Sequence, residues 1–121
     1  MSSADIVGGG KRSHFTEELV ILNGAALSDV LDFRSVASAA IFVPASFLGE
    51  VAFKVSITED GTFTALYDED DALIEIATTA ERWYFIPVKV FPCHFVKIWS
   101  QTAGVDTNQN ADRTLVIMAK A

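Results

Sequence analysis

Hydrophobic and polar residues alternate along much of this chain in short runs. The clearest run spans residues 51–58, where the larger apolar side chains occupy every second position: Val51, Phe53, Val55 and Ile57. Successive residues of a β-strand point to opposite faces of a sheet. The run therefore predicts a strand with one buried face and one face in water.

The segment after this run predicts a hairpin. It contains Asp60-Gly61, a dipeptide that supplies the positive φ angles of a tight turn, and alternation resumes over residues 63–67. Residues 68–71, with the sequence DEDD, are too polar and self-repelling for a sheet interior. They predict a second turn.

Seven other apolar runs, separated by turn residues, complete the pattern. They span residues 19–22, 27–33, 39–43, 73–78, 81–88, 94–101 and 113–120. Residues 17–22 and 35–40 are also compatible with short helices, although Pro44 would end the second. Residues 104–112 predict a polar loop. Strands at such regular spacing are typical of an all-β, antiparallel sandwich or barrel, here with eight or nine strands.

The two ends of the chain differ in composition. Residues 1–14 include three successive glycines followed by Lys11 and Arg12, a composition that disfavours a fixed backbone. We expect a flexible N-terminal arm over residues 1–14 and a single sandwich domain over residues 15–121. Lys11 and Arg12 are candidate contacts if the arm orders on a partner; the alternative is an arm without a role.

Charge and cysteine content exclude several classes of protein. A net charge of −7 repels phosphate backbones and anionic membrane surfaces, so we expect neither a nucleic acid nor a membrane as partner. Cys93 is the single cysteine and cannot form an intramolecular disulfide. The sequence has neither a membrane-spanning apolar run nor a signal-peptide pattern at its start. We expect synthesis in the cytoplasm.

Candidate catalytic chemistry is sparse. The only histidines are His14, in the predicted arm, and His94, whose neighbour Cys93 should point to the opposite face of a strand. The acidic residues 68–71 lack the glycine and distal glutamate of a calcium loop, which leaves a solvated turn or, as the alternative, a weak calcium site. We therefore expect no catalytic residue, metal site or cofactor, and a protein that is not an enzyme.

Aromatic residues give the one positive signal for binding. Alternation places Phe95 and Trp99 on one face of the run 94–101 and Val96 and Ile98 on the other, so both faces are apolar. Either loops of the same chain cover the outer face, or the face is buried against copies or a larger lattice. A third reading makes Trp83 or Trp99 a stacking platform for sugars. Trp83, Phe95 and Trp99 are the predicted interface residues, together with Lys11 and Arg12.

The order of several motifs resembles a known group of proteins. Residues 41–49 read IFVPASFLG, 60–70 read DGTFTALYDED, and 93–100 and 113–117 read CHFVKIWS and RTLVI. This series is similar to small structural proteins of tailed bacteriophage virions, over about residues 23–120. The chain departs from that group at Asp71 and Ala72, where a glycine is usual, and in a longer loop over residues 105–112.

The resemblance implies a fold and a function. It implies a β-sandwich of the jelly-roll kind that serves as a capsid decoration or cement protein on the capsid exterior. The implied partners are the major capsid protein and other copies of the chain, in a homo-oligomer that we expect to be a trimer. The alternative is a carbohydrate-binding or receptor-binding module of a head fibre or tail.

Overall fold

The computed structural model of this protein describes residues 14–121, which form ten strands and one short 3₁₀ helix. The elements are β1 (His14–Ile21), β2 (Leu27–Asp32), β3 (Ser38–Val43), β4 (Glu50–Ser56), β5 (Thr64–Ala65), β6 (Glu75–Ile76), β7 (Arg82–Phe85), η1 (Val88–Val90), β8 (Phe95–Thr102), β9 (Val105–Asp106) and β10 (Arg113–Lys120). The predicted arm lies outside the described residues except for His14, where β1 begins. Lys11 and Arg12 are among the residues outside.

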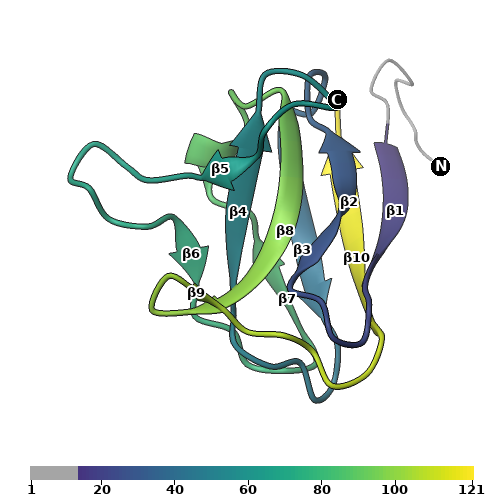
Figure 1. Cartoon of the computed structure of the whole chain (residues 1–121). Coiled ribbons are helices and arrows are strands. Elements are labelled where there is room, and N and C mark those ends of the chain that lie inside the picture. The colour runs from purple at the N-terminus through teal and green to yellow at the C-terminus, as the bar shows by residue number, and fades with distance from the viewer. Residues whose placement is uncertain (1–13) are drawn as a thin grey trace, which may run out of the picture.

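Two antiparallel sheets make up the domain. One has four strands in the order β1-β10-β3-β7. The other has six, in the order β2-β8-β4-β5, with β6 also paired to β4 and β9 to β8. The sheet that contains β8 lies in front of the sheet that contains β3 and β10 (Figure 1). The all-β sandwich predicted from the spacing of apolar runs is confirmed.

The strand pairings are nested along the chain. The outermost pair is β1 with β10, and inside it come β2 with β8, β3 with β7, and β4 with β5 and β6. Successive pairs alternate between the two sheets, as if one long hairpin had been rolled up. This is the arrangement of a jelly roll.

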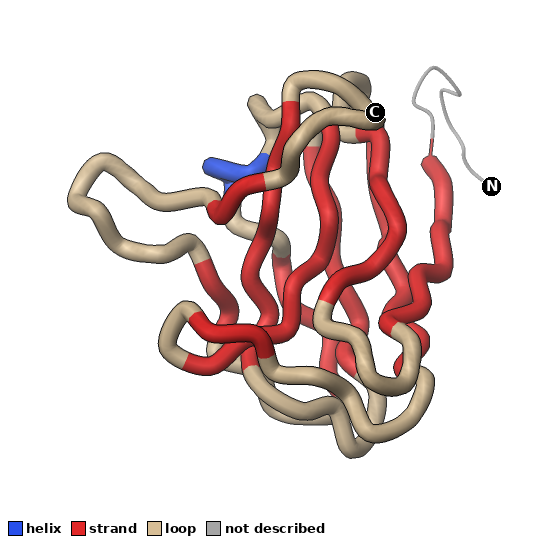
Figure 2. Tube along the Cα trace, in the orientation of Figure 1, coloured by secondary structure: helices blue, strands red, loops and turns tan. Residues whose placement is uncertain are grey.

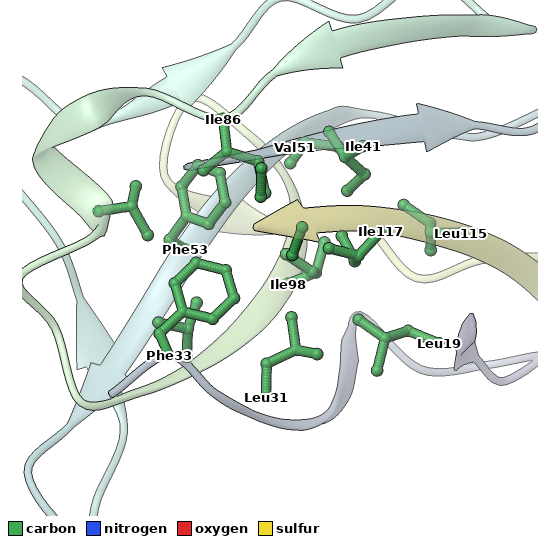
Figure 3. Packing of buried hydrophobic residues seen from close by; sticks show 14 of the residues in the cluster. Leu19, Leu31, Phe33, Ile41, Val51, Phe53, Ile86, Ile98, Leu115 and Ile117 are labelled. Atoms are coloured by element: carbon green, nitrogen blue, oxygen red, sulfur yellow. The ribbon is translucent and has the colours of Figure 1, made fainter. Parts of the chain in front are cut away.

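Side chains from both sheets fill the space between them. Phe53 and Ile98 come from one sheet, Ile41 and Ile117 from the other, and Phe33 from the segment that follows β2 (Figure 3). All five are at most 2% exposed. Burying each such side chain stabilises the fold by about 1.5–3 kcal/mol. Of these residues, those in strands occupy every second position. Their neighbours along each strand therefore point to the outer face of the sheet.

The tight hairpin lies elsewhere than predicted. The φ angle of Gly61 is not positive, and a long turn connects β4, which ends at Ser56, to β5. Ile57 therefore lies outside the strand and is 81% exposed. The two-residue turn is instead Ala103-Gly104, with φ of 53° and 81°, between the paired residues Thr102 and Val105. This turn creates β9 in the segment predicted as a polar loop.

The helical alternatives for residues 17–22 and 35–40 are wrong, because both segments contribute to paired strands. β10 pairs with β1 along its full length and with β3 over Ser38 to Phe42, which satisfies the backbone groups that a helix would use internally. The strand predicted for residues 81–88 is too long. It ends at Phe85, and Pro87 is the N-cap residue of η1, which begins at Val88. No helix within residues 14–121 is long and apolar enough to cross a membrane.

The buried side-chain amide of Gln109 forms hydrogen bonds between loops at one end of the sandwich. These loops lie at the bottom of the view (Figure 2). Gln109 is 2% exposed. Its Nε2 donates to the carbonyl of Leu48 at 2.8 Å, and its Oε1 accepts from the N–H of Leu48 at 3.0 Å. Its backbone bonds to Ala25 and Gly24. Through its side chain and its backbone, Gln109 thus joins three loops that are distant in sequence.

Replacing this amide should weaken the fold. Gln109→Ala leaves the partly buried N–H and C=O of Leu48 without their side-chain partner, so we expect the free energy of unfolding to fall by about 1–3 kcal/mol. The neighbouring exposed Asn108→Ala should change it by less than about 0.5 kcal/mol. Urea denaturation measures both variants. Equal effects of the two substitutions would contradict this role for Gln109.

Candidate functional site

The outer surface of the four-stranded sheet is apolar, and no other segment within residues 14–121 covers it. Seven outward-pointing residues of its four strands form what we call the outer apolar face: Val20, Ala40, Phe42, Trp83, Phe85, Val116 and Met118. Phe85 is 89% exposed, Met118 48% and Trp83 45%. A monomeric protein rarely leaves such a continuous apolar area in water.

Strand register places these residues side by side. Ala40 is opposite both Met118 and Phe85, so one row of side chains crosses three strands. A second row runs through Val116, Phe42 and Trp83. In this second row the rings of Phe42 and Trp83 lie 5.4 Å apart, centroid to centroid. The outer apolar face is therefore a direct consequence of the alternation that fills the core.

A groove of about 520 Å³ lies on this face. Phe85 and Met118 line it from strands on either side of β3, while Ser38 and Ala40 of β3 lie between them. Small side chains between large ones explain the hollow. The first residues of β1 extend the groove to the edge of the sheet.

Full charges are few on this side of the sheet. Among the outward-pointing residues of the four strands, only Glu18 and Lys120 carry one, and they have opposite signs. The chain as a whole has a net charge of −7. The excess of acidic groups therefore lies away from the outer apolar face.

The other sheet has its outer face covered by the chain itself. Trp99 is 4% exposed and packs there with Ala26 and Ala52. Its Nε1–H donates to Asp106 Oδ1 in β9 at 2.7 Å, and Lys54 Nζ lies 4.5 Å from the ring centroid. Of the two explanations for apolar groups on both faces of a strand, covering by loops is the one that holds for β8.

The predicted interface residues divide accordingly. Trp83 is exposed on the outer apolar face, as an interface residue must be. Trp99 and Phe95 are only 4% and 7% exposed, so the chain itself covers both side chains and they present little surface to a partner. The guanidinium of Arg34 lies 4.9 Å above the Phe95 ring. Lys11 and Arg12 lie outside the described residues.

An ion pair holds Arg34 over that ring. Arg34 donates from its side chain to both carboxylate oxygens of Asp32, at 2.9 and 2.7 Å. These hydrogen bonds lower the pKa of Asp32 to about 2. The pair is largely exposed, so solvent screening keeps its contribution to stability small. Its role is to keep the guanidinium stacked on Phe95.

Cys93 and His94 do not separate onto opposite faces as predicted. Both precede β8, and both line a second groove of about 410 Å³ together with Ser56 and Thr58. Burial raises the pKa of the Cys93 thiol, which favours the uncharged form over the nucleophilic thiolate. The fold thus places both residues at one groove without activating the sulfur.

The acidic turn over residues 68–71 is organised by its own backbone. Asp68 Oδ1 accepts from the N–H groups of Asp70 and Ala72 at 2.8 and 3.0 Å, which lowers the pKa of Asp68. Glu69 pairs with Lys89 at 3.0 Å. Within the described part of the chain, no three His, Cys, Asp or Glu side chains are grouped so as to hold a metal ion. The predicted turn is confirmed, with Tyr67 and Leu73 bridged across it.

Sequence reasoning missed most of the outer apolar face. The sequence predicts Phe85 and Met118 only as strand residues, although alternation over residues 113–120 puts apolar side chains on both faces of that strand. The sequence does contain one indication of this face, because Thr114, Val116 and Met118 alternate with the buried residues of the same strand. Which strands lie beside that strand follows only from the order of strands in the sheet.

Comparison of the chain with models of protein families, with curated proteins and with solved structures gave no match.

The two tryptophans should differ sharply in their contribution to stability. Trp99→Ala removes a buried ring and its bond to Asp106, so we expect a loss of about 3–5 kcal/mol in the free energy of unfolding. Trp83→Ala should cost about 1 kcal/mol, because almost half of that ring is already in water. Urea denaturation of both variants gives the comparison. A larger loss for Trp83→Ala would contradict the assignment of the covered and uncovered sheets.

Proposed function

We propose that this protein is a non-enzymatic structural subunit of a bacteriophage virion, a capsid decoration protein that stabilises the lattice of the major capsid protein. The observation that carries the proposal is the outer apolar face. It is wide, nearly free of charge and exposed in the isolated chain. Such a surface favours burial against another protein.

The motif resemblance supplies the class of particle. The series from residues 41–49 to residues 113–117 is similar to small virion proteins of tailed phages, and the jelly roll implied by that similarity is the fold of the chain. Fold alone does not define function. The proposal therefore rests on the resemblance together with the exposed face.

Stabilisation of a lattice needs no chemistry beyond buried area. A subunit that binds the assembled lattice and not the free capsid protein shifts the equilibrium toward the assembled state by mass action. Linked copies bind more tightly than single ones, because the second contact forms at a high effective concentration. On this account the acidic surface remains toward solvent.

Addition to capsids tests the proposal. Purified protein mixed with capsids of the parent phage that were assembled without it should bind them and raise their melting temperature. Phe85→Asp places a charge on the outer apolar face, at its most exposed aromatic side chain, and should weaken uptake by about tenfold or more. Uptake is measured by sedimentation of particles with bound protein, and stability by scanning calorimetry.

Ile57→Asp is the matched control, since Ile57 is equally apolar and 81% exposed but lies beyond the end of β4. It should bind like the unmodified chain. Capsids that take up no protein, and are equally stable in its presence, would contradict a decoration role.

A carbohydrate-binding module of a head fibre or tail is the second candidate, and Trp83 is the observation that favours it. Its indole is 45% exposed and lies beside the groove formed by Phe85 and Ala40. Exposed indoles stack on sugar rings through their apolar face. Binding to a glycan array that disappears in Trp83→Ala, and persists in Ile57→Asp, would favour this candidate over decoration.

A further inference from the structure

We propose that a second copy of this chain covers the outer apolar face, in a two-fold contact in which Phe85 of each copy enters the groove of the other. The inference deepens the proposed function, because it names the occupant of the face, and it rests on that face being an assembly surface. Three observations on the face and one symmetry argument lead to it.

The first is shape. Phe85, at 89% exposure, projects from the edge strand β7. Ala40 is directly opposite it on β3, and Ala40 lies between Phe85 and Met118 in the groove of about 520 Å³. A projecting ring and a groove therefore lie side by side on the same surface. When two copies face each other about a two-fold axis, the ring of each can enter the groove of the other.

The second is charge. Glu18 and Lys120 balance each other among the outward residues of the sheet, whereas the whole chain has a net charge of −7. Two copies that approach through other surfaces bring together an excess of acidic groups, which repel. The outer apolar face is where copies can meet without that repulsion.

The third is size. β1 and β10 are eight residues long, β3 is six and β7 is four. At about 3.4 Å per residue and 4.8 Å between strands, the face covers roughly 420 Å² per copy. Two such faces bury roughly 850 Å², which is in the range of weak, transient contacts. The contact should therefore form reversibly with concentration.

The fourth is symmetry. A contact between identical surface patches is a two-fold contact, so it joins copies in pairs. A trimer would require two different patches that fit each other. The inference thus departs from the trimer expected at the level of sequence, and the mass of the particle in solution distinguishes the two.

Sedimentation equilibrium of the full chain tests the inference directly. The unmodified protein and the control Ile57→Asp should reach twice the 13.1 kDa chain mass as concentration rises. Phe85→Asp should weaken association by about tenfold or more, since it buries an unpaired charge. Circular dichroism of all three proteins verifies that the fold is retained.

Fluorescence gives a readout that needs no destabilising substitution. Dilution of the unmodified protein should shift tryptophan emission to longer wavelength as Trp83 becomes hydrated, while the buried Trp99 stays constant. The shift should disappear in Trp83→Phe. A monomer at every concentration, a trimer, or a dimer unaffected by Phe85→Asp would overturn the inference.

The outcomes separate this inference from the proposed function. A chain that stays monomeric yet binds capsids overturns the two-fold contact and leaves decoration standing, with the capsid protein as occupant of the face. A Phe85-dependent dimer that binds no capsid supports the contact and contradicts decoration.

Discussion

A sandwich of two sheets has two outer faces, and within residues 14–121 loops cover only one of them. The register that directs Ile41 and Ile117 into the core directs Phe42, Val116 and Met118 outward from the same strands. On the six-stranded sheet, β9 and the residues around Leu73 and Ala65 lie over Trp99. On the four-stranded sheet the apolar side chains remain in water. The proposals made for this protein depend on that asymmetry.

Much of the fold could be predicted from local pattern, and the errors have physical causes. Alternation around Phe53 and Ile98 located central strands, and the spacing of turns indicated a sandwich. The tight hairpin was assigned to Asp60-Gly61, although Ala103-Gly104 adopts it. Turn propensity is local, whereas the choice between two Gly-containing turns depends on which strands finally pair.

The candidate surface was harder to predict for a similar reason. Whether an outward aromatic ring is covered depends on loops distant in sequence, so Trp83 and Trp99 look alike in the chain and differ in the fold. One is 45% exposed and the other 4%. The neighbours of Met118 across the sheet are Thr16 and Ala40. The three residues are far apart along the chain, so no short-range sequence pattern predicts that they are neighbours.

The central claim is that the outer apolar face is open in the free chain and covered in its working state. Hydroxyl-radical footprinting of Phe85, Met118 and Trp83, with Trp99 as internal reference, measures this most directly. In dilute protein the account predicts strong labelling of the first three and little of Trp99, and protection of the three within the parent particle. Equal labelling of the face in the free and particle-bound states, or protection of it in the free monomer, would contradict the account.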